Sequence, residues 1–258
     1  MHDARVLIKP PLTSRFGRRR TQEPTQLPKL LAENLRSIDQ RLFLRLAEMS
    51  DAEEDDFEKL RIRQLATLVA STLETLIEQT DAQMDADATV VQELLQGLAD
   101  DSGEFELPVP AERLGALRES LRERGGALDE GFVATVKAYM RKASDDGLDG
   151  MVDILRVLLQ AYAAERLRSL AGSQPAEEGD EAARAAVVAA FEASPAEWDQ
   201  VLRAQSSECS AEAVVQLLQD KMGEVVLSMP AGSAVQTVLA EYLNELMGAA
   251  RAIAAEDV

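Results

Sequence analysis

Apolar residues recur at spacings of three and four along most of this chain, which is the period of an amphipathic α-helix. The first such segment begins at Pro28, because proline suits the first turn of a helix. Its apolar positions are Leu31, Leu35, Ile38, Leu42, Leu46 and Met49. A second helix is predicted to open in the acidic segment 51–58, since acids are favoured at the positive end of the helix dipole. Its apolar face is predicted to comprise Phe57, Leu60, Leu65, Leu68, Thr72, Leu76 and Ile77.

Further helical segments follow up to residue 171. They are predicted at 86–99, 111–124, 128–143 and 150–171. The pair Gly125 and Gly126 is expected to end the second of these, because glycine commonly terminates helices. The segment 150–171 is apolar over a wide arc, so we expect it to be the central helix of a bundle.

The C-terminal part is also predicted to be helical. An acidic linker is expected at 172–182, where Gly, Ser and Pro occur with acids and no base. Residues 194–197, Ser-Pro-Ala-Glu, form a capping box with proline at the first helical position. Ser210 and Ser233 are expected to cap the last two helices. No strand-like alternation competes, so the sequence predicts an all-α, multi-helix bundle with a helical domain at 28–171 and a smaller C-terminal helical part at 183–258.

Residues 1–27 show no sustained period and are predicted to form an extended, proline-containing arm. Residues 1–22 hold six basic residues against one acid, Asp3, so their net charge is +5. Apolar side chains lie among the basic ones, as they would on a segment that occupies a groove. The arm residues predicted to bind a partner are Val6, Leu7, Ile8, Leu12, Arg15, Phe16, Arg18, Arg19 and Arg20.

The rest of the chain is strongly acidic. The whole chain carries a net charge of −19, which leaves −24 on the residues after the arm. Such a body repels phosphate backbones and anionic membrane surfaces, so nucleic-acid binding is disfavoured. No stretch is long and apolar enough to predict a membrane span, and the start lacks the apolar core of a signal peptide. Its basic, acid-poor composition resembles an organelle transit peptide or its remnant.

Most named chemistries lack their residues. The chain has a single His and a single Cys, which excludes a disulfide framework and a Cys/His zinc site. Nucleophile-elbow, P-loop and dinucleotide-binding motifs are absent from the sequence. Cys209 has an acidic neighbour and no base, so it is interpreted as incidental. We therefore predict no catalytic residue, no metal ligand and no cofactor, while the sequence leaves open whether a small molecule binds.

Residues 145–149, Asp-Asp-Gly-Leu-Asp, match the DDxxD pattern with which all-helical prenyl and terpene synthases bind magnesium and diphosphate. Here Gly147 and Gly150 interrupt the helical spacing, and no basic pair follows. We interpret the segment as a turn between helices with Asp149 as an N-cap. The acidic runs 51–58 and 81–87 do not have the spacing of a calcium-binding loop and are interpreted as solvated helical segments.

Two segments carry a resemblance to known proteins. They are residues 146–162, DGLDGMVDILRVLLQAY, and residues 34–43, NLRSIDQRLF. Together they resemble uncharacterised all-helical plastid proteins of plants and green algae, over about residues 30–170. These motifs are packing and turn patterns, so the resemblance implies a setting, the chloroplast stroma or thylakoid surface, and no functional residue. Without it, the expected location is cytoplasmic.

These observations favour a non-enzymatic, protein-binding assembly factor or accessory subunit of a larger complex, attached through the arm. Two alternatives stay open at this point. One is an all-helical, metal-dependent enzyme that uses diphosphate at residues 145–149, and the other is a factor that contacts RNA or a membrane through Arg18–Arg20.

Overall fold

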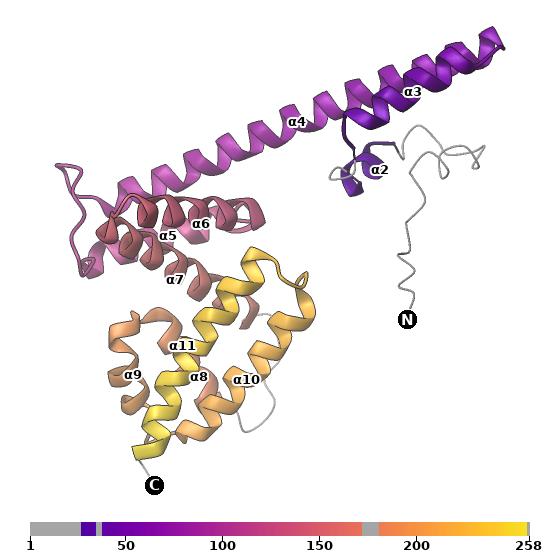
Figure 1. The fold of residues 1–258 in the computed structure, drawn as a ribbon. Coiled ribbons are helices and arrows are strands. Elements are labelled where there is room, and N and C mark those ends of the chain that lie inside the picture. The colour runs from indigo at the N-terminus through magenta and orange to yellow at the C-terminus, as the bar shows by residue number, and fades with distance from the viewer. Residues whose placement is uncertain (1–26, 35–37, 172–180, 257–258) are drawn as a thin grey trace, which may run out of the picture. The chain divides into compact units, whose positions relative to one another are not determined.

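The computed structural model describes residues 27–34, 38–171 and 181–256. Over these ranges the secondary structure is helical and contains no strand, which confirms the all-α prediction. The predicted arm and most of the predicted linker at 172–182 lie outside the described residues. The chain divides into two compact units, residues 1–82 and residues 83–258, each of which has a core of its own (Figure 1).

The first unit contains α2 (Leu27–Glu33), α3 (Gln40–Ala52) and the first part of α4 (Asp56–Leu98). The Asp39 side chain caps α3 by accepting from the Arg41 N–H. Arg63 Nε of α4 donates to Ser50 Oγ of α3 at 3.2 Å. The small core that joins these helices consists of Leu27, Leu31, Val69 and, packed against them, Ile38, Leu42, Phe43, Leu65, Leu73 and Leu76.

Helix α4 differs from the sequence prediction, which placed one helix around 57–77 and another at 86–99. In the structure a single helix covers both segments. The joining residues, 78–85, are polar almost throughout, so they show no apolar period, but they include neither Gly nor Pro to stop a helix. Likewise, the helix predicted from Pro28 is divided into α2 and α3.

The second unit contains the rest of α4 and the helices that follow it. These are α5 (Ala111–Arg124), the 3₁₀ turn η3 (Gly125–Ala127), α6 (Glu130–Asp145), α7 (Asp149–Ala171), α8 (Glu181–Glu192), the 3₁₀ turn η4 (Pro195–Glu197), α9 (Trp198–Ala204), α10 (Ala211–Ser228) and α11 (Ala234–Glu256). Helix α7 contacts α5, α6, α8 and α11. Figure 1 shows α5 and α6 on one side of α7 and the C-terminal helices on the other. The prediction that residues 150–171 form the central helix is therefore confirmed.

One apolar core runs through the second unit, from α4 to α11. Its fully buried members include Phe132 of α6, Leu158 of α7, Phe191 of α8 and Leu243 of α11. The helices before and after the predicted linker thus share one core, and the division of the chain lies at 82/83 instead. The physical reason is that the composition of a connecting segment does not determine whether the apolar faces of the helices on either side of it share a core.

The helix ends follow the predicted signals closely. Ser194 and Glu197 form the reciprocal capping box, and the Ser210 and Ser233 hydroxyls accept from the N–H groups of Ala213 and Gln236. Gly125 ends α5 with a positive φ of 34°, a conformation that favours glycine. These caps satisfy backbone groups that a helix cannot satisfy internally.

Candidate functional site

The residues predicted to bind a partner, Val6 to Arg20 of the arm, lie outside the described part of the chain. Candidate sites are therefore found on the surfaces and in the cavities of the two units. They are the exposed side of the α3–α4 hairpin in the first unit, a pocket between α5 and α7, and the acidic segments singled out in the sequence.

Helix α4 carries apolar side chains on two sides within the first unit. Leu65, Val69 and Leu76 face the small core. In contrast, Phe57, Leu60 and Leu68 are 67%, 53% and 47% exposed. At about 100° per residue these three fall within an arc of about 80°, away from the packed side. We call Phe57, Leu60 and Leu68 the exposed apolar stripe.

The sequence placed all of these residues except Val69 on one apolar face of a single helix, and the structure corrects that prediction. Ile77, from the same predicted face, is also 55% exposed, and Met49 of α3 is 39% exposed. The reason is that two apolar sides, taken together, still satisfy spacings of three and four. Burial of only one of them leaves the other uncovered, which is unusual for a surface helix of a globular protein.

Acidic side chains surround the end of the hairpin that bears Phe57. Glu48 and Glu58 pair with Arg45 and Arg61 at 3.0 and 2.7 Å. The Asp55 carboxylate caps α4 by accepting from the N–H groups of residues 57 and 58. The Glu53 carboxylate accepts from the N–H groups of residues 54 and 55. The remaining acids, Asp51, Glu54 and Asp56, have no ion-pair partner among the described residues. We call these three the hairpin acids.

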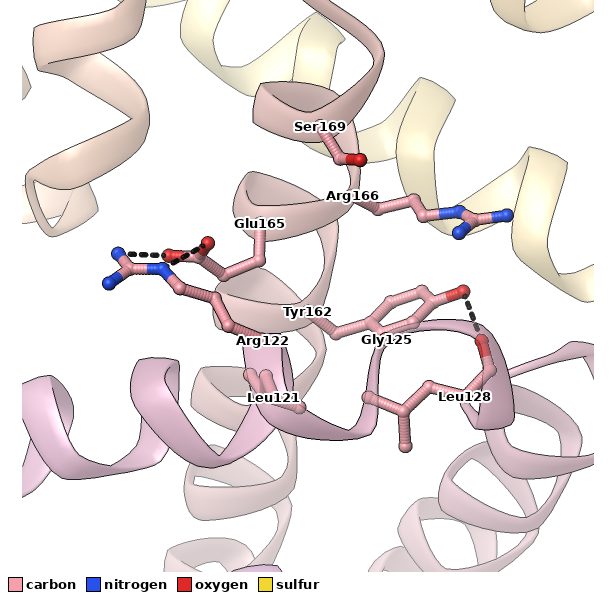
Figure 2. A pocket seen from close by; sticks show the side chains of 8 residues that line it. All are labelled: Leu121, Arg122, Gly125, Leu128, Tyr162, Glu165, Arg166 and Ser169. Atoms are coloured by element: carbon pink, nitrogen blue, oxygen red, sulfur yellow. Dashed lines mark hydrogen bonds and ion pairs between the residues drawn. The ribbon is translucent and has the colours of Figure 1, made fainter. Parts of the chain in front are cut away.

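A polar pocket lies between the end of α5, η3 and α7 (Figure 2). Arg122 donates to both carboxylate oxygens of Glu165, from Nε at 2.8 Å and from a terminal nitrogen at 2.9 Å. Glu165, whose side chain is only 8% exposed, also pairs with Arg168 at 3.2 Å. The Tyr162 hydroxyl donates to the Leu128 carbonyl at 3.2 Å, as Figure 2 shows.

The electrostatics of this pocket are those of a structural network. The hydrogen bond that Arg122 donates to Glu165 raises the pKa of Arg122, and burial raises the pKa of Tyr162, so neither group approaches a pKa suited to proton transfer near neutral pH. The cavity measures about 150 Å³, below the range of about 300–1,000 Å³ that is common for ligand pockets. Arg122, Glu165 and the Tyr162 hydroxyl already have partners within the chain, so we assign them to stability.

The DDxxD-like segment forms a turn between α6 and α7. Gly147 has a φ of 71°, and the N–H of Leu148 reaches back to the Ala143 carbonyl at 2.8 Å, as in a Schellman-type helix end. Asp149 was predicted to be the N-cap, the residue that precedes the helix, but it is the first helical residue of α7. In the described parts of the chain, no group of three or more His, Cys, Asp or Glu side chains is arranged to hold a metal ion.

The tryptophan and several methionines contribute to the core of the second unit. Trp198 and Met247 are buried, and Met140, Met151, Met222 and Met229 pack against the same cluster. Cys209 is half-buried, and burial raises the pKa of its thiol, so the group is held as a thiol at neutral pH. The methionines and Trp198 are therefore packing residues.

Searches for relatives give no match among protein-family models, curated proteins or solved structures. None of the helices in the described ranges combines the length and the apolar character that are needed to span a membrane.

Proposed function

We propose that this chain is a non-enzymatic protein-binding factor, an assembly factor or accessory subunit, and that the α3–α4 hairpin is one of its docking surfaces. The observation that carries the proposal is the exposed apolar stripe, Phe57, Leu60 and Leu68, on a helix whose other apolar side is already packed. Full burial of side chains of this kind contributes about 1.5–3 kcal/mol each, before the cost of association is subtracted.

The charges around the stripe indicate the chemistry of the partner segment. The hairpin acids, Asp51, Glu54 and Asp56, offer carboxylates close in sequence to Phe57. A segment that covers the stripe and pairs with these acids must present apolar side chains together with Lys or Arg. An amphipathic basic helix of a partner protein has this character, and helices commonly bind helical surfaces in this way.

The N-terminal arm enters the proposal through its sequence. Its apolar residues, from Val6 to Phe16, and its arginines, from Arg15 to Arg20, are proposed to contact the partner as a second element. Residues 1–22 carry a net charge of +5 together with apolar side chains, which is the character proposed for the partner segment. The arm is therefore expected to compete with the partner for the exposed apolar stripe. A plastid location belongs to the same proposal and rests on the resemblance of residues 34–43 and 146–162 and on the basic start of the chain.

The experiment places a photo-cross-linking amino acid at position 60 of the full-length chain. A matched control carries the same group at position 227 of α10, where Leu227 is also an exposed apolar residue, 88% accessible. After irradiation in cells, cross-linked peptides are identified by mass spectrometry. We expect position 60, and not position 227, to label one protein, through a segment that is both basic and apolar.

Surface variants provide the second arm of the test. Replacing Phe57 and Leu60 by Ser is expected to abolish cross-linking from position 68 to that protein, whereas Leu227→Ser leaves it unchanged. Equal labelling from positions 60 and 227 would contradict the proposal. A cross-link from position 60 to residues 1–22 of the same molecule would also contradict it, because the stripe would then be covered by the chain's own arm.

A further inference from the structure

An apolar cavity of the second unit measures about 350 Å³, within the common range of small-molecule sites. It lies between the loop at 107–109, α5, α7, the segment that joins α8 to η4, and α11. Small side chains on three elements make the space. They are Ala161 and Ala164 of α7, Ala193 of the joining segment and Ala196 of η4.

Two buried hydrogen-bond donors, on side chains that line this cavity, have no acceptor among the described residues. They are Nε of Arg118 and the hydroxyl of Tyr242. The Tyr242 residue is only 3% exposed. An unpaired buried polar group destabilises the folded state, so native structures seldom keep one without a reason.

The other contacts of these two side chains fix them in place. The terminal nitrogens of Arg118 donate to the carbonyls of Glu192 and Ala193, the latter at 2.9 Å, at the end of α8. The Tyr242 ring meets the Trp198 ring edge-on, with centroids 5.3 Å apart. Each donor is therefore held before any ligand arrives, and this lowers the ordering cost of binding.

The remaining polar groups that line the cavity are already paired. The Ser194 hydroxyl donates to Glu197 at 2.7 Å, and Asp153 pairs with Arg156 at 2.5 Å. The lining thus includes two side chains with an unpaired donor, one of them a permanent cation, among residues that are mostly apolar. A group with two acceptor oxygens and a negative charge, attached to an apolar body, satisfies both features.

We propose that this cavity binds an apolar monocarboxylate, such as a medium-chain fatty acid. The carboxylate accepts from Arg118 Nε and from the Tyr242 hydroxyl, and the alkyl chain lies against Leu114, Val157 and Ala161. A phosphate group suits the site less well, because it brings more acceptor oxygens and charge than two donors satisfy. Burial raises the pKa of Tyr242 above its ordinary value, so the hydroxyl stays protonated and remains a donor.

The probe is octanoate, added to the full-length chain and compared with 1-octanol and with inorganic phosphate. Trp198 is the sole tryptophan of the chain, and its contact with the Tyr242 ring makes its fluorescence a local reporter. We expect saturable fluorescence change and a rise in melting temperature with octanoate, since a ligand that binds the native state stabilises it. Octanol should bind at least about tenfold more weakly, and phosphate should have no effect.

The decisive variant is Tyr242→Phe, which removes a hydroxyl that has no hydrogen-bond acceptor among the described residues. It should melt no lower than the natural chain, yet bind octanoate about tenfold or more weakly and octanol equally well. Tyr139→Phe is the matched control, because Tyr139 does not line the cavity and its loss should leave octanoate binding unchanged.

Three outcomes would overturn the assignment. They are equal affinity for octanoate and octanol, unchanged octanoate binding in Tyr242→Phe, and no saturable binding at all. The last result would mean that an ordered water between the two donors satisfies them.

Discussion

Replacing Gly131 by Ala is the sharpest test of packing in the second unit. Gly131 lies in the first turn of α6, and Asp87 of α4 approaches its Cα closely. A Cβ built at this position would fall well inside contact distance of Asp87 Oδ2, with Asp87 Cγ and Asp129 Oδ1 each at 3.2 Å. Asp87 is only 5% exposed and accepts from Gln83 Nε2 at 3.0 Å, so its carboxylate has little freedom to move away.

The expected magnitude follows from two opposing effects. In a helix, Ala is ordinarily favoured over Gly by about 0.5–1 kcal/mol. Forcing an extra carbon into a packed site costs about 1–3 kcal/mol, and displacement of the Asp87 carboxylate loses its hydrogen bond from Gln83, worth about 1 kcal/mol. The net expectation for Gly131→Ala is a loss of about 1–3 kcal/mol, which lowers the melting temperature by roughly 2–10 °C for a unit of this size.

Gly115→Ala is the matched control, since among the described residues nothing lies within 4 Å of a Cβ at that helical position. It should stabilise the chain by about 0.4–1 kcal/mol. Urea unfolding followed by the fluorescence of buried Trp198 reports on the second unit directly. If Gly131→Ala were as stable as Gly115→Ala, the close approach of Asp87 would be refuted. The double variant with Asp87→Ala should recover most of the packing loss, and additivity there would refute Asp87 as its cause.

The remaining predictions concern side-chain networks of the same unit. Glu165→Gln, which leaves Arg122 without its carboxylate, should cost about 1–3 kcal/mol in urea unfolding, because the acid is buried while the arginine is partly solvated. Ser194→Ala should cost about 0.5–2 kcal/mol. The backbone and hydroxyl donors of Ser194 lower the pKa of Glu197. Their contribution to folding stability is therefore fully present at a pH above the ordinary pKa of a glutamate, and it fades as the pH falls through the lowered pKa. The difference between Ser194→Ala and the natural chain should therefore shrink from pH 7 to pH 3 in thermal scans. Tyr162→Phe should lose about 0.5–1.5 kcal/mol in urea unfolding, since it leaves a buried carbonyl without its donor.

Local signals in the sequence were sufficient to predict the helical class and many helix ends. The capping box at Ser194, the cap at Ser210 and the glycine end at Gly125 each act within one turn, so their effect can be read from neighbouring residues. The same holds for the central position of α7, because a helix that is apolar over a wide arc must be covered on several sides.

Features that depend on which side of a helix is covered could not be predicted. In α4 the apolar pattern contains both Leu65, which packs, and Leu68, which is exposed, and the pattern alone does not say which side meets α3. The continuity of α4 through residues 78–85 was missed for a related reason. Its polar residues have adequate helix propensity, but propensity without apolar periodicity gives no visible signal.

The two cavities beside α7 show why a site of this kind is invisible in sequence. Each is lined by one arginine of α5 and by one tyrosine, and nothing local distinguishes Arg122 and Tyr162 from Arg118 and Tyr242. The difference is made by long-range partners. Arg122 meets a carboxylate on α7 and Tyr162 meets a loop carbonyl, whereas around Arg118 Nε and the Tyr242 hydroxyl the described chain supplies apolar walls and no acceptor. Donors that meet acceptors within the chain stabilise the fold. Donors beside an apolar cavity that meet no acceptor in the chain remain able to form a hydrogen bond with a ligand.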